Sequence, residues 1–324
     1  MVADPAQAHV PVMLGRVTQL LADAPDGPIV DGTLGAGGHA LEVLRARLDR
    51  YGQAHLVGVD RDADAIELAR TVLAQLPTDV VDLEFVHARF DDAPSSLDRL
   101  GIGDVAGVLL DLGISSMHVD RAERGFSYRH DGPLDMRMDR GLQLTAADLV
   151  NESSVEDLER ILRDFGEDPN ARRIARAIVA ERPFETTTQL AAVVRAGLPA
   201  AARRRGSQPA TRTFQALRIA VNNELDALAA ALPALLDRLM IGGVMVVLSY
   251  HSLEDRLVKR SFADAAAGCI CPPELPVCTC GRVPNFAHVV RRPERVGADE
   301  ATSNPRSTAA RLRAIRRIDR QARP

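Results

Sequence analysis

Short apolar runs alternate with amphipathic stretches along the first part of the chain. The apolar runs are strand-sized, and between them apolar side chains recur every three or four residues, as over residues 63–76. Such alternation is typical of a mostly parallel sheet with helices on both faces, so the pattern predicts an α/β fold. The predicted strands are Ile29–Val30, Leu56–Val59, Leu83–Val86, Val105–Leu110 and Val244–Leu248.

The alternation stops after the fourth predicted strand. A strand-poor, helical stretch follows, and a long helix over 213–240 then leads to the last strand. We therefore expect residues 1–115 and 212–324 to form one discontinuous α/β domain, interrupted by an all-helical insert over residues 116–211. Because the insert follows the carboxyl end of a strand, where open α/β folds bind ligands, we expect it to overhang the ligand. Its predicted helices are Ala146–Asn151, Val155–Phe165, Arg172–Glu181 and Thr188–Ala196, with Thr187 or Thr188 as the cap of the last one.

A glycine-rich segment, DGTLGAGGH over residues 31–39, joins the first predicted strand to a helix. Glycines let the backbone approach a ligand closely, and the N–H groups at a helix start face that ligand. Asp60 ends the next strand, where its carboxylate can accept hydrogen bonds from the ribose hydroxyls of an adenosine. The sequence therefore predicts an adenosine cofactor. The residues expected to hold it are Asp31, Gly35, Gly37, Gly38 and Asp60.

Two adenosine cofactors fit the glycine spacing. Gly35-x-Gly37-x-x-Ala40 satisfies the dinucleotide fingerprint, which keeps an NAD(P)-dependent oxidoreductase as an alternative. However, Asp31 precedes the glycines, and a carboxylate there repels a pyrophosphate but suits the ammonium group of S-adenosylmethionine. The loop also lacks an Arg or Lys that could neutralise phosphate. These two features favour S-adenosyl-L-methionine.

Basic residues are unevenly placed along a chain whose formal net charge is −4. Residues 172–218 hold ten arginines and two acidic residues, and residues 282–324 hold eleven arginines and four acidic residues. Two basic segments on an acidic body fit an enzyme that docks RNA or DNA on one face, but they also fit solvated helix faces. The arginines expected to contact RNA are Arg203, Arg204, Arg205 and Arg212.

The four cysteines lie in one short segment as two C-x-C pairs, at Cys269, Cys271, Cys278 and Cys280. This clustering is not that of a disulfide framework and suits a reducing cytoplasm. Four thiols could bind zinc, although C-x-C is tighter than the usual C-x2-C, and a loop of reduced thiols is the alternative. No basic and apolar leader is apparent at the start, and the apolar runs are too short for a membrane span. We therefore expect a cytoplasmic protein. The chemistry of the expected cofactor does not need a metal.

Several segments together resemble the bacterial 16S ribosomal RNA (cytosine-N4)-methyltransferases, which act on a decoding-centre cytidine. The resemblance covers nearly the whole chain and rests on several motifs that are specific to this family. These are HVPVML (9–14), DLGISS (111–116), ERGFS (123–127), DGPLDMRMD (131–139), TRTFQALRI (211–219), SYHSLEDR (249–256) and NPRS (304–307). The resemblance implies the class I S-adenosylmethionine-dependent methyltransferase fold, which is Rossmann-like, with a helical insert that helps to recognise RNA. It also implies a substrate within the assembled small ribosomal subunit.

Carried over residue by residue, the resemblance implies seven cofactor positions. They are Gly37, Gly38, His39, Asp60, Phe90, Asp111 and His118. An aromatic after the third strand can stack on adenine, as expected for Phe90. His118 departs from the family pattern, in which Gln is frequent, so its contact would depend on pH.

Candidate catalytic residues lie after the fourth and fifth predicted strands. Asp111 and Ser115 follow the fourth strand, where Asp111 could accept N–H bonds and aim an amine along the methyl–sulfur axis, or could merely cap a turn. His251 follows the fifth strand and is a candidate substrate contact. Tyr250 could stack on a flipped base. A noncatalytic RNA-binding assembly factor with the same fold remains an alternative, and the oligomeric state is open, with a dimer as one option.

Overall fold

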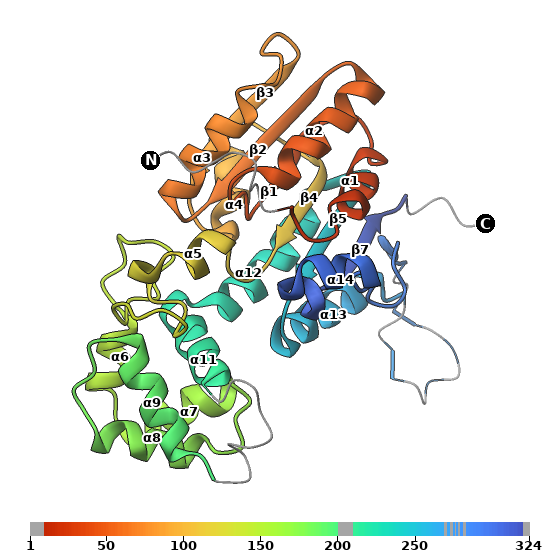
Figure 1. The fold of residues 1–324 in the computed structure, drawn as a ribbon. Coiled ribbons are helices and arrows are strands. Elements are labelled where there is room, and N and C mark those ends of the chain that lie inside the picture. The colour runs from red at the N-terminus through yellow and green to blue at the C-terminus, as the bar shows by residue number, and fades with distance from the viewer. Residues whose placement is uncertain are drawn as a thin grey trace. The chain divides into compact units, whose positions relative to one another are not determined.

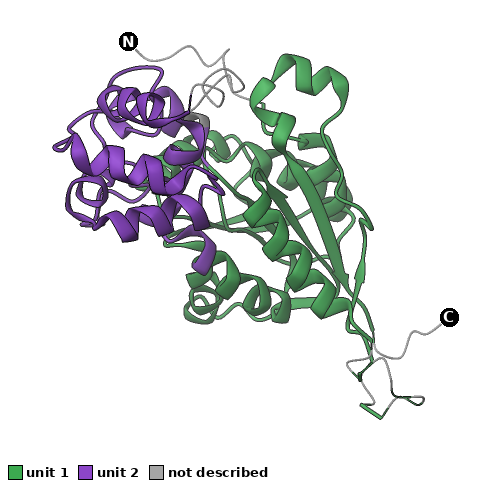
Figure 2. Cartoon of the chain, turned by 90° about the horizontal axis from the view of Figure 1, so that it is seen from below, with its two compact units in different colours: residues 1–113, 227–324 green, residues 114–226 purple. Residues whose placement is uncertain are grey.

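The computed structural model describes residues 10–199, 210–268 and 283–319, with 271, 272, 275, 277, 279 and 280 from the intervening loop. The chain forms two compact units (Figure 2). Unit 1 comprises residues 1–113 and 227–324, and unit 2 comprises residues 114–226. Unit 2 thus ends at Asp226, whereas the sequence pattern placed the end of the insert at residue 211.

Unit 1 is built on a seven-stranded sheet with the order β3-β2-β1-β4-β5-β7-β6. The first five strands are parallel neighbours, and β7 and β6 add antiparallel pairings at one edge. The predicted mostly parallel α/β fold is therefore confirmed. The strands are β1 (Ile29–Asp31), β2 (Ala54–Asp60), β3 (Val81–His87), β4 (Val105–Asp111), β5 (Leu239–Ser249), β6 (Phe286–His288) and β7 (Arg311–Arg317).

Helices cover both faces of this sheet, so most residues of the central strands β1, β4 and β5 are buried (Figure 1). In β1, Ile29 packs into the core under α1, α2 and α3, while its neighbour Val30 packs into the core under α4, α12 and α13. The helices of unit 1 are α1 (Leu14–Ala22), α2 (Gly38–Tyr51), α3 (Ala63–Leu73), α4 (Ala93–Arg99), α13 (Ser252–Ala266) and α14 (Ala298–Ser303), with α12 (Glu224–Asp237) crossing the boundary between units. Short 3-10 turns are η2 (Phe90–Asp92) and η4 (Pro305–Ala309). Asp62 caps α3 as predicted.

Unit 2 has a hydrophobic core of its own, to which Leu134, Leu158, Ile174, Leu190 and Phe214 contribute. Its elements are α5 (Ser116–Asp120), η3 (Ala122–Arg124), α6 (Ala146–Glu152), α7 (Val155–Asp164), α8 (Ala171–Ala180), α9 (Thr187–Gly197) and α11 (Thr211–Asn222). All four predicted helices of the insert are present. The cap of α9 is Thr186 rather than Thr187 or Thr188, because Gln189 accepts the Thr186 N–H in a capping box.

The prediction of one continuous helix over residues 213–240 is wrong. Asn223 adopts a left-handed conformation (φ 49°, ψ 44°), which Asn tolerates better than most residues, and it separates α11 from α12. Leu239 and Met240 belong to β5. Within the described ranges, no single helix is long and apolar enough to cross a bilayer; α11 and α12 meet that test only as a pair bent by 59°.

Candidate active site

The glycine loop follows β1 and leads into α2, as the sequence predicted. Gly35 (φ 53°) and Gly37 (φ 80°) have positive φ, and Gly37 is the N-cap of α2. A Cβ on Gly37 would lie 3.3 Å from the Cα of Ala69, and a Cβ on Gly38 would lie 2.6 Å from the ring of Pro11. The positive φ of Gly35 and Gly37 favours glycine, and a side chain at Gly37 or Gly38 would require Ala69 or Pro11 to shift.

Asp60 ties the end of β2 to the glycine loop. Its Oδ2 atom accepts the Gly35 N–H at 2.7 Å, and its Oδ1 atom accepts the Asp62 N–H at 2.8 Å. Phe90 borders the same loop, because a Cβ on Gly32 would lie 3.1 Å from the Phe90 Cβ. The fold thus brings Asp60 and Phe90, the carboxylate and the aromatic residue predicted to contact adenosine, next to the glycine loop.

A second group of predicted residues lies at the carboxyl ends of β1 and β4. Asp31 is 2% exposed and accepts the Thr33 N–H at 3.1 Å. Burial raises the pKa of Asp31 to about 7, although nearby His39 and the Thr33 N–H lower it. Thr33 also connects the two strands, since its Oγ1 accepts the Asp111 N–H at 2.6 Å.

His39 lies in the same group with both ring nitrogens buried. Its Nε2 atom is 3.5 Å from Asp111 Oδ2, and neither nitrogen has a hydrogen-bond partner among the described residues. The ring is therefore available to a partner other than the residues that the structure describes.

Tyr250 has a contact that sequence reasoning missed. Its hydroxyl donates to Asp111 Oδ1 at 2.8 Å, and its ring packs on Gly113, whose Cβ would lie 3.2 Å from the Tyr250 Cδ2. Burial raises the pKa of Tyr250, and the charge of Asp111 raises it further, so the hydroxyl stays a donor. The only hint in the sequence was that Asp111 and Tyr250 lie at the carboxyl ends of two predicted parallel strands. The role of Tyr250 in base stacking stays a prediction.

His251 is the N-cap of α13. Its Nδ1 atom accepts the Glu254 N–H at 3.4 Å, and its Nε2 atom lies 3.1 Å from Glu254 Oε1. Glu254 is 3% exposed and also accepts the Tyr250 N–H at 2.8 Å. Both nitrogens of His251 thus face its own helix, and its contact with substrate stays a prediction.

The other predicted site residues belong to unit 2 and are described within it. Ser115 caps α5, with its Oγ atom 3.3 Å from His118 Nδ1. His118 is 7% exposed, and its ring centroid lies 4.9 Å from that of Phe126. Arg212 is exposed and donates to the Glu167 carbonyl at 2.8 Å. The predicted RNA contacts Arg203, Arg204 and Arg205 lie outside the described residues.

The chemistry of this site suits a cationic ligand with hydroxyl groups. Three carboxylates (Asp31, Asp60 and Asp111) surround the glycine loop, and burial already opposes ionisation of Asp31. A pyrophosphate would meet like charge here, whereas sulfonium and ammonium groups would stabilise the carboxylates. The residues present therefore fit S-adenosylmethionine better than a dinucleotide.

Comparison with known proteins decides the class. The sequence profile of the MraW methylase family matches residues 6–318. The chain belongs to the MraW methylase family. This membership confirms the predicted methyltransferase class, with S-adenosyl-L-methionine as its cofactor, and leaves the oxidoreductase alternative without support.

The relatives of this MraW methylase are similar over nearly their whole length. The "Ribosomal RNA small subunit methyltransferase H" of Thermobifida fusca is 52% identical over 97% of this chain and 94% of its own. The protein of the same name from Symbiobacterium thermophilum is 48% identical over 95% of this chain and 96% of its own. A crystal structure of a putative rRNA-methylase from Clostridium thermocellum has a TM-score of 0.44 and 12% identity over 96% of this chain and 100% of its own.

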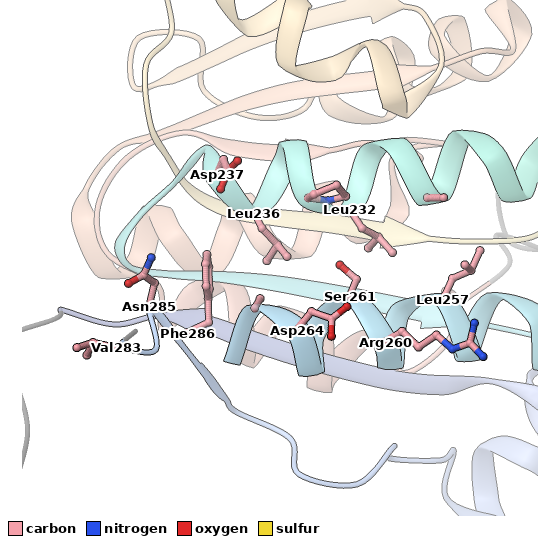
Figure 3. Close-up of a pocket in the computed structure, with 13 residues that line it drawn as sticks. Leu232, Leu236, Asp237, Leu257, Arg260, Ser261, Asp264, Val283, Asn285 and Phe286 are labelled. Carbon is pink, nitrogen blue, oxygen red and sulfur yellow. The ribbon is translucent and has the colours of Figure 1, made fainter. Parts of the chain in front are cut away.

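Two further features of this MraW methylase lie apart from the glycine loop. The Cys271 Sγ atom lies 3.8 Å from the Thr279 Oγ1 atom, and Cys269 and Cys278 lie outside the described residues, so the choice between zinc and reduced thiols stays open. A groove of about 460 Å³ separates α12 from α13, with Leu232, Leu236 and Ser261 among its walls (Figure 3). No residue of the glycine loop lines it.

Proposed function

We propose that this chain transfers a methyl group from S-adenosylmethionine to N4 of a cytidine in the decoding centre of 16S ribosomal RNA, within the assembled small subunit. The observation that supports this most is the Asp111 carboxylate, held by Tyr250 beside the glycine loop of a MraW methylase. The relatives named small-subunit methyltransferases support the choice of RNA. The sequence motifs support the choice of N4.

The cofactor, when bound, supplies an electrophilic methyl group. In this proposal Asp60 accepts the ribose hydroxyls, Phe90 stacks on adenine, and Asp31 faces the ammonium group. The loop glycines Gly35, Gly37 and Gly38 let the backbone approach closely. His39 and His118 are the remaining proposed cofactor contacts.

Asp111 has one oxygen left for the acceptor amine. Its Oδ1 atom already accepts the Tyr250 hydroxyl, so Oδ2 accepts an N4 hydrogen and aims the nitrogen lone pair at the methyl group. As the N–C bond forms, the methyl–sulfur bond would break and leave its electron pair on sulfur, and the amine would lose a proton, for which Oδ2 is the nearest proposed acceptor. Most of the catalysis is then orientation. Ser115 and His251 remain proposed substrate contacts, and the helical insert is proposed to recognise RNA.

The test uses small subunits from a strain that lacks the homologous enzyme. The wild-type chain and labelled cofactor should add one methyl group at N4 of a single cytidine, located by mass spectrometry of the ribosomal RNA. Asp111→Ala should abolish transfer while subunit binding persists. Label on another base or another atom would refute the N4 assignment. Binding without any transfer by the wild-type chain would instead favour the assembly-factor alternative.

A further inference from the structure

A basic pocket lies on α8, within unit 2. It has a volume of about 420 Å³ and is lined by Pro169, Asn170, Arg172, Arg173 and Arg176. All three arginines are exposed. No acidic side chain lines this pocket, so its walls present guanidinium groups to solvent.

The core of unit 2 fixes the direction of these arginines. On the opposite face of α8, Ile174, Ala175 and Ile178 are fully buried at 0% exposure. Since residue 176 lies four positions after residue 172 and three positions after residue 173, the three side chains share the outer face of the helix. The helix therefore presents the three side chains from a rigid support.

Two arginines of α7 are paired with acidic side chains, whereas two of the pocket arginines are not paired with any described residue. On α7, Arg160 lies 2.8 Å from Asp157, and Arg163 lies 3.1 Å from Asp164. In the pocket, Arg172 has one distant acidic neighbour, Glu159 at 4.0 Å. Arg173 and Arg176 form no ion pair with any residue that the structure describes. Like charges at i and i+3 repel one another, so this arrangement favours an anionic partner.

We propose that this pocket binds phosphate groups of the RNA backbone. The planar, forked guanidinium matches phosphate geometry, and a polyanion complements a wall without acidic side chains. This inference rests on the proposed function, because it names the surface through which the insert holds its RNA. The proposed phosphate contacts thus lie on α8, whereas the sequence predicted them at Arg203–Arg205.

The test compares two double variants with the same loss of charge. Arg173→Gln/Arg176→Gln removes the two arginines without ion pairs, and the matched control Arg160→Gln/Arg163→Gln removes two neutralised arginines of the same unit. Binding to protein-free small-subunit RNA is measured from about 0.1 M to 1 M salt. If both arginines contact phosphate, the log–log slope should become shallower by about 1.4–1.8, since each contact accounts for roughly 0.7–0.9. For each arginine that contacts phosphate, the variant should lose about 5- to 8-fold more affinity for RNA at 0.1 M salt than it loses at 1 M salt.

The outcomes separate the pocket from the proposed function. Equal losses in both double variants would overturn the pocket in favour of a general electrostatic field. Unchanged affinity and slope in the pocket variant would overturn it outright, while methyl transfer by the wild-type chain would leave the proposed function standing. A loss seen with assembled subunits but not with free RNA would point to a ribosomal protein and also overturn the proposal. Cofactor affinity, measured by calorimetry, should be equal in all variants.

Discussion

At the scale of single residues, the two oxygens of the Asp111 carboxylate have different neighbours, and these neighbours determine its orientation. Oδ1 accepts the Tyr250 hydroxyl at 2.8 Å, and Oδ2 lies 3.5 Å from the buried Nε2 atom of His39. A carboxylate fixed at one oxygen presents the other in a defined direction, which is what orientation of an amine requires. Tyr250 is in this view a positioning residue.

Tyr250→Phe separates this view from base stacking. The variant keeps the ring on Gly113 but loses the donor to Asp111, so we expect kcat to fall by about 10- to 150-fold, the equivalent of roughly 1.5–3 kcal/mol for one lost hydrogen bond to a charged group. KM for small subunits should stay unchanged. Stacking alone predicts wild-type kcat for Tyr250→Phe and a raised KM for Tyr250→Ala. Steady-state kinetics of both variants decide between the two.

Asp31 gives the site a pH dependence. Its folded pKa of about 7 lies above the usual value of 3.8, so the folded state keeps a proton that the unfolded state loses between these pH values. The stability that this group contributes below about pH 4 is therefore lost as the pH rises to about 7. If Asp31 faces the ammonium group of the cofactor as proposed, binding requires the ionised carboxylate, so the affinity for the cofactor should fall about tenfold per pH unit below 7.

Asp31→Asn is the control for this dependence. The variant should bind the cofactor more weakly at pH 8, and between pH 5 and 7 its affinity should stay flat, as measured by calorimetry. A wild-type profile in the variant would show that another group carries the titration.

At the scale of elements, the sequence predicted the five parallel strands and the insert helices because their apolar periods are regular. It missed β6 and β7, since β7 (Arg311–Arg317) carries four arginines and reads as a polar segment. It also joined α11 to α12 across Asn223, whose left-handed conformation no periodicity reveals. The glycine loop and Asp60 were predictable because they are contiguous motifs, whereas the Tyr250–Asp111 contact depends on the register of β4 beside β5.

At this scale, the contacts of Asp60 link the end of β2 to the glycine loop, and a substitution of Asp60 tests this link. Asp60→Ala removes both the proposed ribose acceptor and the acceptor of the Gly35 N–H, so the end of β2 no longer holds the glycine loop. We expect cofactor affinity to fall by about 1–3 kcal/mol or more, because two functions are lost together. Calorimetry gives the affinity, and hydrogen exchange at the loop amides reports the second function. Unchanged affinity in a folded variant would remove Asp60 from the cofactor site.

At the scale of the whole molecule, the two units have separate cores and can be perturbed separately. Leu158 is fully buried in the core of unit 2, and Leu110 is fully buried in unit 1 against the loop residue Gly32. Truncating either to Ala should cost about 2–5 kcal/mol locally. Leu158→Ala should reduce hydrogen-exchange protection within residues 114–226 and weaken RNA binding, but leave cofactor affinity unchanged. Leu110→Ala should do the reverse, weakening cofactor binding while protection of residues 114–226 persists. If Leu158→Ala also lowered protection across the sheet of unit 1, the two units would unfold as one cooperative body, and the prediction of separately perturbed units would be wrong.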